Sequence, residues 1–210
     1  MKFNKIVALA FAAVLGFGAQ TANAQSLSPS TKWHWDKGTI VVETPARPAG
    51  QKNVLGLKLP KYKTVRIGLV GLGMRGPGAV DNFCVLPGVE IVALCDFVEA
   101  RAVAQNEKLR KRGLPPAAIY SGEKGYKELC ARPDIDLVYI ATDWAHHFPV
   151  AECALKHGKN VADEVPSAMN LEECWKLVDL SEKMQKNCMI LENCCYDWFE
   201  MRTLNMAQHG

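Results

Sequence analysis

The sequence has little excess charge of either sign. It holds 25 Lys and Arg against 22 Asp and Glu, a formal net charge of +3, and two of the lysines lie within residues 1–24. Proteins that bind nucleic acid need a clustered basic face. The densest basic run, 108–112, is typical of the solvated end of a helix. We therefore expect no nucleic-acid partner.

The sequence also lacks a C-x-x-C pair and histidines at metal-ligand spacing. Its five histidines include the neighbours His146 and His147, which would point apart, so we expect no metal site. Eight cysteines are spread over the chain, with Cys95 ending an apolar run and Cys153 and Cys174 on apolar helix faces. These positions favour cysteines that pack as small hydrophobic side chains, and a disulfide framework is the alternative.

Beyond residue 24, no uninterrupted apolar run reaches the ~18 residues of a membrane-spanning helix. Residues 1–24 have the pattern of a Sec-type signal peptide. Lys2 and Lys5 precede the apolar stretch Ile6–Phe17, and Ala22-Asn-Ala24 is a small-residue cleavage site. We expect export to the periplasm or beyond, and no membrane association once the signal is removed. A retained membrane anchor is the alternative.

The most informative stretch runs from Thr64 to Asp96. An apolar run, Thr64–Val70, leads into the glycine turn Gly71–Gly76, and a second apolar run, Val89–Cys95, ends at Asp96. This order predicts a strand, a glycine turn that opens a helix, a second strand and then an acidic side chain. Such a unit is typical of dinucleotide binding. A purely structural α/β turn is the alternative.

Each residue of this motif has its own task. Gly71 permits a tight turn out of the strand, Gly73 lets the backbone approach a pyrophosphate, and Gly76 lets the helix pack closely. The helix N-terminus offers unpaired N–H groups to the phosphates. Asp96 would accept a hydrogen bond from the ribose 2′-hydroxyl and repel a 2′-phosphate. We therefore predict NAD rather than NADP as the cofactor.

The remaining chain divides into an arm and a domain. Residues 25–63 are rich in Ser, Pro, Lys and Gly and predict an extended arm, with Trp33 and Trp35 as anchors; disorder is the alternative. In residues 64–210, apolar runs alternate with helical patterns: runs at 137–141, 160–162 and 189–191, and patterns at 98–112, 123–131, 149–157 and 170–186. The alternation predicts an α/β fold with a doubly wound parallel sheet, the Rossmann fold.

Three segments at the expected strand ends, Ala141–His147, Ala154–Lys159 and Glu164–Pro166, resemble the superfamily of glucose-fructose oxidoreductase and inositol dehydrogenase. The dehydrogenases of that superfamily place a proton-transferring lysine between the Glu and the Pro, where this chain has Val165. An aliphatic side chain cannot exchange a proton. Ordinary sugar-alcohol dehydrogenation by that route is therefore disfavoured.

A narrower resemblance accounts for the valine. It is carried by Arg47–Gly56, Gly71–Gly76, Glu164–Pro166, Glu172–Trp175 and Leu191–Tyr196, which together resemble glycoside hydrolase family 109, the NAD-dependent α-N-acetylgalactosaminidases. The resemblance implies a glycan with terminal N-acetylgalactosamine as substrate. It also implies transient oxidation at the sugar C3, elimination of the glycosidic bond, addition of water and return of the hydride.

The same resemblance implies where the cofactor binds. The predicted cofactor-binding residues are Gly71, Gly73, Met74, Arg75, Gly76, Asp96, Trp144, Ala145, His146, His147, Glu164, Val165 and Asn193. Three of them have simpler alternatives: Trp144 as packing, His147 as a helix cap, and Glu164 held by Lys159 or a backbone N–H. Asp163 departs from the family pattern, and strand alternation is expected to turn it away from the site.

Family members continue beyond the position of Gly210 into a second domain with an open sheet. We therefore expect this chain to be the N-terminal part of such a protein, without its catalytic base and inactive alone. Two other functions stay open: an exported NAD-dependent sugar oxidoreductase, and a non-catalytic NAD-binding module. A homo-oligomer also stays open.

Overall fold

The computed structural model describes residues 33–43 and 46–209, so the signal peptide predicted for residues 1–24 lies outside the described residues. The chain divides into two units, 1–43 and 44–210, and each is described by itself. Within the described residues, no helix has the length and apolar character needed to cross a membrane.

The described part of the first unit is a hairpin. Strands β1 (Trp33–Asp36) and β2 (Thr39–Val42) pair antiparallel, and all their residues are exposed. The two turn residues, Lys37 and Gly38, have φ values of 47° and 85°, which suits the type I′ turn of a two-residue hairpin. The sequence analysis did not predict this hairpin.

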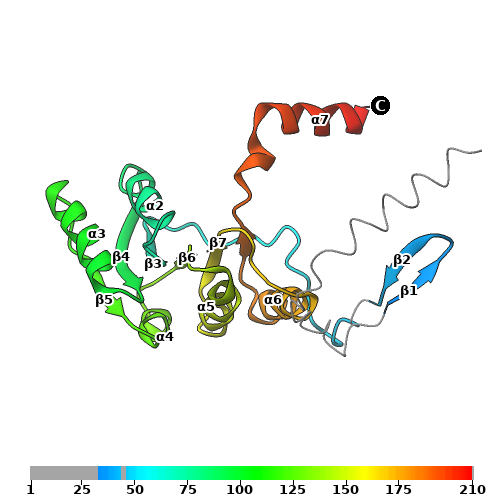
Figure 1. Cartoon of the computed structure of the whole chain (residues 1–210), viewed down its shortest axis with the longest axis horizontal. Coiled ribbons are helices and arrows are strands. Elements are labelled where there is room, and N and C mark those ends of the chain that lie inside the picture. Colours follow the sequence, from blue (N-terminus) through cyan, green and yellow to red (C-terminus); the bar gives the residue numbers. More distant parts are fainter. Residues whose placement is uncertain (1–32, 44–45, 210) are drawn as a thin grey trace, which may run out of the picture. The chain divides into compact units, whose positions relative to one another are not determined.

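The second unit alternates strands and helices along the chain (Figure 1). Its strands are β3 (Val65–Val70), β4 (Val89–Asp96), β5 (Ala118–Ser121), β6 (Leu137–Ile140), β7 (Asn160–Asp163) and β8 (Cys188–Ile190). Its helices are α2 (Gly76–Phe83), α3 (Glu99–Lys111), α4 (Gly125–Ala131), α5 (Trp144–Lys156), α6 (Leu171–Met184), the 3₁₀ turn η1 (Asn193–Tyr196) and α7 (Trp198–His209).

The strands form one parallel sheet in the order β5-β4-β3-β6-β7-β8. Numbered from β3, this is the order 3-2-1-4-5-6 of the doubly wound fold, and it confirms the predicted fold class. Successive strands are added on one side of β3 as far as β5 and on its other side from β6 onward, so the strand order switches direction between β3 and β6. Ligands of such sheets bind at this switch point, beyond the carboxyl ends of the strands.

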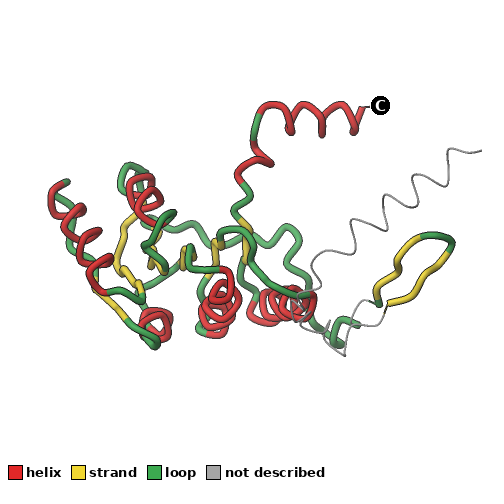
Figure 2. Tube along the Cα trace, viewed as in Figure 1, coloured by secondary structure: helices red, strands yellow, loops and turns green. Residues whose placement is uncertain are grey.

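Helices cover both faces of the sheet, as Figure 2 shows with the strands in yellow between two sets of helices. Leu69 packs with Val80 and Leu109 on the face covered by α2 and α3. The next residue, Val70, packs with apolar residues of α4, α5 and α6 on the other face. Adjacent residues of β3 therefore serve two cores, which is why its buried part, residues 67–70, has no polar side chain.

Three expectations need correction. Strand β5 was not predicted, and α5 begins at Trp144 rather than at Pro149. Cys174 is exposed rather than on a buried helix face. Asn170 caps α6, because its Oδ1 accepts a hydrogen bond from the Glu173 amide at 2.9 Å. All eight cysteines are free thiols.

Candidate functional site

The glycine turn between β3 and α2 is fixed by close backbone contacts. Gly71 has a φ of 92°, and a side chain there would collide with the backbone of Ala141 in the neighbouring strand-end loop. A side chain at Gly76 would collide with the Gly71 carbonyl. Gly73 differs, because a Cβ there would meet nothing nearer than Arg101 Nη1, 3.7 Å away. Gly73 thus leaves a backbone surface open to a ligand.

This turn borders an open cavity of about 1200 Å³. The cavity lies beyond the carboxyl ends of β3, β4, β5 and β6, where the fold predicts a ligand. Seven of the predicted site residues line it: Gly71, Gly73, Met74, Arg75, Asp96, Ala145 and His146. Gly76, Trp144, His147, Glu164, Val165 and Asn193 do not line it.

Asp96 joins the end of β4 to the glycine turn. Its Oδ2 accepts a hydrogen bond from the Leu72 amide at 2.7 Å, and its Oδ1 accepts one from the Val98 amide at 2.9 Å. Arg101 Nη1 lies 3.4 Å from Oδ1. Asp96 is only 5% exposed, yet it forms part of the cavity wall. The carboxylate therefore organises the turn as well as facing the space where a ribose is predicted.

Arg75 and Glu164 connect the glycine turn to the loop after β7. Arg75 Nε donates to Glu164 Oε1 at 3.0 Å, and the Tyr139 hydroxyl donates to the same oxygen at 2.8 Å. The hydrogen bond to Glu164 raises the pKa of Arg75. Burial, followed by the hydrogen bond to Glu164, raises the pKa of Tyr139. Both donors therefore keep their protons at neutral pH.

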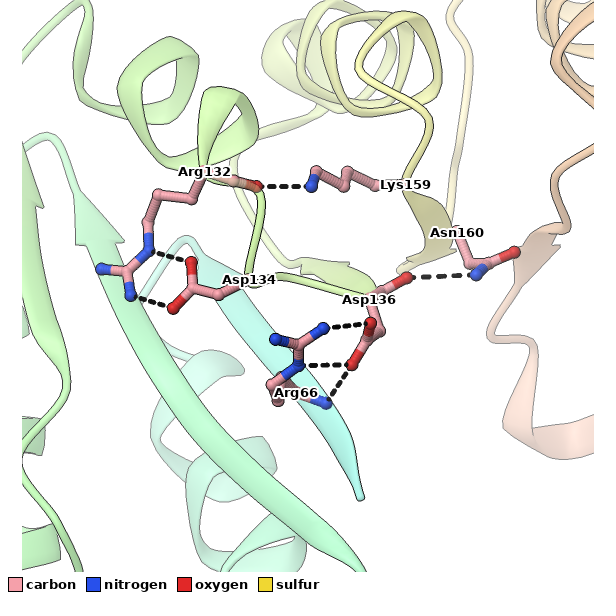
Figure 3. Close-up of polar contacts among 6 residues, drawn as sticks. All are labelled: Arg66, Arg132, Asp134, Asp136, Lys159 and Asn160. Atoms are coloured by element: carbon pink, nitrogen blue, oxygen red, sulfur yellow. Dashed lines mark hydrogen bonds and ion pairs between the residues drawn. The ribbon is translucent and has the colours of Figure 1, made fainter. Parts of the chain in front are cut away.

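Lys159, the partner proposed for Glu164, lies elsewhere. Its ammonium donates to the backbone carbonyl of Arg132, as Figure 3 shows. Burial lowers the pKa of Lys159. The alternative in which Lys159 holds Glu164 is therefore wrong, and the partners of Glu164 are Arg75 and Tyr139.

His147 lies beneath the cavity rather than in its wall. It is 2% exposed, and its two ring nitrogens contact the carbonyl oxygens of Pro166 at 2.7 Å and Thr142 at 3.1 Å. It therefore ties the loop after β6 to the loop after β7. His147 lies inside α5, so it is not the cap of that helix. Asp163 is fully buried, as strand alternation predicts.

Trp144, Val165 and Asn193 are exposed residues outside the cavity wall. Trp144 begins α5 after Asp143, whose carboxylate contacts His146 Nδ1 at 2.8 Å. This contact lowers the pKa of Asp143. Asp143 and His146 both line the cavity.

The cavity wall on the β5 side was not predicted from the sequence. Gly122, Glu123, Lys124, Tyr126 and Lys127 line it from the loop after β5 and the start of α4. These residues could not be placed because β5 was not predicted. The run Ala118–Ser121 followed by a glycine was the available signal. Arg101 was missed as well, although it lies on α3 near Asp96.

The residues of the cavity fit NAD. The first turn of α2 has no acidic residue and no side-chain cap, so its N-terminus can face phosphate oxygens. Positive side chains in the wall complement a pyrophosphate: Arg75, Arg101, Lys124 and Lys127. Asp96 supplies the acidic group expected for an adenosine ribose.

Comparisons with known proteins agree with this geometry. Residues 65–192 match the model of the GFO_IDH_MocA family, described as an oxidoreductase family with an NAD-binding Rossmann fold. The chain is 68% identical over 191 residues to glycosyl hydrolase family 109 protein 5 of Phocaeicola vulgatus, covering 91% of the chain and 37% of that protein. It is 60% identical over 212 residues to protein 4 of the same species, covering 100% of the chain and 41% of that protein.

A solved structure is similar as well. The myo-inositol dehydrogenase of Lactobacillus casei, in complex with NAD(H) and myo-inositol, matches with a TM-score of 0.60 and 28% identity. The match covers 70% of this chain and 41% of that chain. This chain thus spans about two fifths of the length of its relatives.

Proposed function

The chain belongs to the GFO_IDH_MocA oxidoreductase family and, within it, to glycosyl hydrolase family 109, and from this premise we propose that it forms the cofactor domain of an NAD-dependent glycosidase. Its cofactor is NAD. The proposed substrate is a glycan with terminal α-linked N-acetylgalactosamine. When bound, NAD takes a hydride from the sugar and returns it, so cleavage leaves no net redox change.

The observation that carries the proposal is the loop after β7. Glu164 in this loop is held by Arg75 and Tyr139, while the neighbouring Val165 stands where the dehydrogenases have a lysine. The loop can therefore fix the position of a cofactor but cannot move a proton through Val165. The valine agrees with the family 109 resemblance and disfavours dehydrogenation by the lysine route, and in either function another residue would accept the hydroxyl proton.

The residues of the chain have separable tasks in this proposal. The glycine turn and the N-terminus of α2 bind the pyrophosphate, and Asp96 orients the adenosine ribose. His147 holds together the two loops that border the nicotinamide side, through the carbonyls of Thr142 and Pro166. We further propose export by the pattern in residues 1–24.

Two measurements test the proposal. The first is a calorimetric titration of the chain with NAD, for which we expect saturable binding. The second measurement uses the protein isolated from its native cells. The intact mass of this protein is recorded first. The protein is then incubated with an aryl α-N-acetylgalactosaminide, and free sugar and NADH are followed together.

The outcomes separate the candidate functions. Sugar release without net NADH supports the glycosidase. Net NADH formed with a free sugar supports the oxidoreductase and overturns the glycosidase. NAD binding without release of sugar or formation of NADH supports the non-catalytic binding module. Absence of NAD binding contradicts the proposal that the chain forms a cofactor domain.

A further inference from the structure

Tyr139 carries a polar group into the core beside the sheet. It lies in β6, is 4% exposed and belongs to the apolar cluster on the face covered by α2 and α3. Its ring meets the ring of Phe83, the last residue of α2, edge to face, with the centroids 5.4 Å apart and an interplanar angle of 78°. This packing needs the ring but not the hydroxyl, so the hydroxyl calls for a separate explanation.

The hydroxyl of Tyr139 reaches out of the core to Glu164. It donates to Glu164 Oε1 at 2.8 Å. The amide of Glu164 donates to the carbonyl of Ile140, the next residue of β6, at 2.9 Å. The end of β6 therefore fixes both the backbone and the side chain of Glu164. Because that side chain is only 16% exposed, water can replace the tyrosine hydroxyl only poorly as a donor.

The same carboxylate oxygen directs the side chain of Arg75. Arg75 is the N-cap residue of α2, but its side chain makes no capping bond, and its Nε donates to Glu164 Oε1 at 3.0 Å. The side chain stays 59% exposed and lines the cavity, whereas Glu164 and Tyr139 do not. The bond to Glu164 uses the Nε–H, so the terminal N–H groups can still donate to a ligand. A series of contacts thus leads from the core to the cavity wall.

We propose that Tyr139 is a positioning residue for NAD, which acts through Glu164 to hold the Arg75 guanidinium at the cavity wall, where the guanidinium contacts the pyrophosphate. This role rests on the function proposed above. A guanidinium binds phosphate oxygens through a planar arrangement of donors, so its orientation matters as well as its charge. A side chain that is already held in place loses less conformational entropy when the cofactor binds.

The test is a double-mutant cycle, measured by calorimetric titration of the full chain with NAD. Tyr139→Phe keeps the ring against Phe83 and removes only the hydroxyl, so we expect the variant to fold, which thermal denaturation verifies. We expect the Kd for NAD to rise about 3- to 10-fold. In an Arg75→Gln background, Tyr139→Phe is expected to change the Kd by less than about twofold, because the side chain on which Tyr139 acts is gone.

Glu164→Gln tests the same series of contacts on the loop, away from the core. The amide keeps an oxygen that can accept from Tyr139, but it lacks the charge that pairs with Arg75. We expect this variant also to weaken NAD binding, and we expect its effect to disappear in the Arg75→Gln background.

Tyr120, in β5, provides a matched control. Its hydroxyl accepts a hydrogen bond from Arg132 Nη1 at 3.3 Å, and Tyr120 does not line the cavity. Tyr120→Phe therefore removes a bonded hydroxyl from the same sheet without touching the contacts that lead to Arg75. We expect the Kd of this variant to equal that of the wild type.

The role of Tyr139 is overturned if Tyr139→Phe leaves the Kd unchanged, or if its full effect persists in the Arg75→Gln background. A lower Kd in Tyr139→Phe overturns it as well, because Glu164 would then keep Arg75 away from the cofactor. An equal loss in Tyr120→Phe would reveal a general effect on the sheet and have the same consequence. Failure of the wild type to bind NAD is a different result, since it contradicts the cofactor domain itself and this role with it.

Discussion

His147 Nδ1 lies 3.6 Å from Asp163 Oδ1, and neither side chain is more than 2% exposed. Both oxygens of Asp163 lack a hydrogen-bond partner among the described residues. Burial raises the pKa of Asp163 to about 8, and the charge of Glu164 acts in the same direction. The contact with His147 is too long for a strong hydrogen bond. Burial therefore favours the protonated form of Asp163.

This protonation predicts a pH dependence of stability. The pKa of Asp163 in the folded protein is raised above the ordinary value of 3.8. The contribution of this group to the stability of the folded state is therefore complete below pH 4 and is lost as the pH rises toward 8. Asp163→Asn cannot ionise. We expect the free energy of unfolding of the wild type to fall relative to that of Asp163→Asn between pH 4 and pH 8. Equal pH profiles from urea denaturation would contradict the assignment.

We expect alanine to have opposite effects on stability at two glycines of α2. Gly76→Ala places a methyl group against the Gly71 carbonyl, and we expect a loss of about 2 kcal/mol or more in the free energy of unfolding. Gly78 is exposed, and a Cβ there meets nothing within 4 Å. Gly78→Ala is expected to stabilise the helix by about 0.5–1 kcal/mol. Thermal denaturation of both variants measures the change in melting temperature. Equal changes for Gly76→Ala and Gly78→Ala would argue against the observed turn.

Asp96 is predicted to matter for both the turn and the cofactor. Asp96→Ala removes the acceptor of the Leu72 and Val98 amides, so we expect NAD affinity to fall by about 1–3 kcal/mol, or roughly 5- to 150-fold. Asp96→Asn keeps one acceptor oxygen and is expected to show a smaller loss. Calorimetric titration with NAD measures both. An unchanged Kd for a folded Asp96→Ala variant would refute the predicted ribose contact.

Arg66, in β3, and Asp136, just before β6, form a bidentate ion pair. The backbone amide and two guanidinium nitrogens of Arg66 donate to the Asp136 carboxylate at 2.8–2.9 Å (Figure 3). We expect Asp136→Asn to destabilise the protein by about 1–3 kcal/mol at pH 7. The hydrogen bonds from Arg66 lower the pKa of Asp136. The difference in free energy of unfolding between the wild type and Asp136→Asn should therefore shrink and then disappear as the pH falls below about 4, because the Asp136 carboxylate becomes protonated.

The exposed pair Arg110 and Glu107 serves as the control for this prediction. Their side chains are 70% and 52% exposed, although the ion pair is as short, at 2.7 Å. Solvent screening leaves such exposed pairs with almost no effect on the free energy of unfolding. Glu107→Gln is therefore expected to leave the urea midpoint almost unchanged. A loss comparable to that of Asp136→Asn would show that burial is not the deciding factor.

The sequence predicted the fold well because its strongest signals are local. The apolar strand β3, the glycine turn and Asp96 lie in one continuous stretch, and their geometry depends on few distant residues. Strand β5 was missed because Ala118–Ser121 shows no clear alternation of apolar and polar residues. Pro149 suggested the start of a helix, but α5 tolerates it inside its second turn.

The site was predicted less completely because its partners are distant in sequence. Arg75 and Glu164 were both assigned to the cofactor, but their mutual hydrogen bond depends on the order of the strands. His147 was assigned to the cofactor by the family resemblance, whereas the helical path of α5 turns it toward the carbonyl of Pro166 and away from the cavity that His146 lines. Contacts of this kind follow from topology, which a residue pattern specifies only indirectly.

The bonds from Asp96 to Leu72 and Val98 also bear on how fast NAD binds. They hold the glycine turn in place in the free protein, so the entropy of ordering the loop is lost during folding rather than during association. A binding site that is already assembled needs no slow closing step. In a stopped-flow experiment, the observed rate would then rise in proportion to the NAD concentration, without reaching a plateau set by rearrangement of the loop.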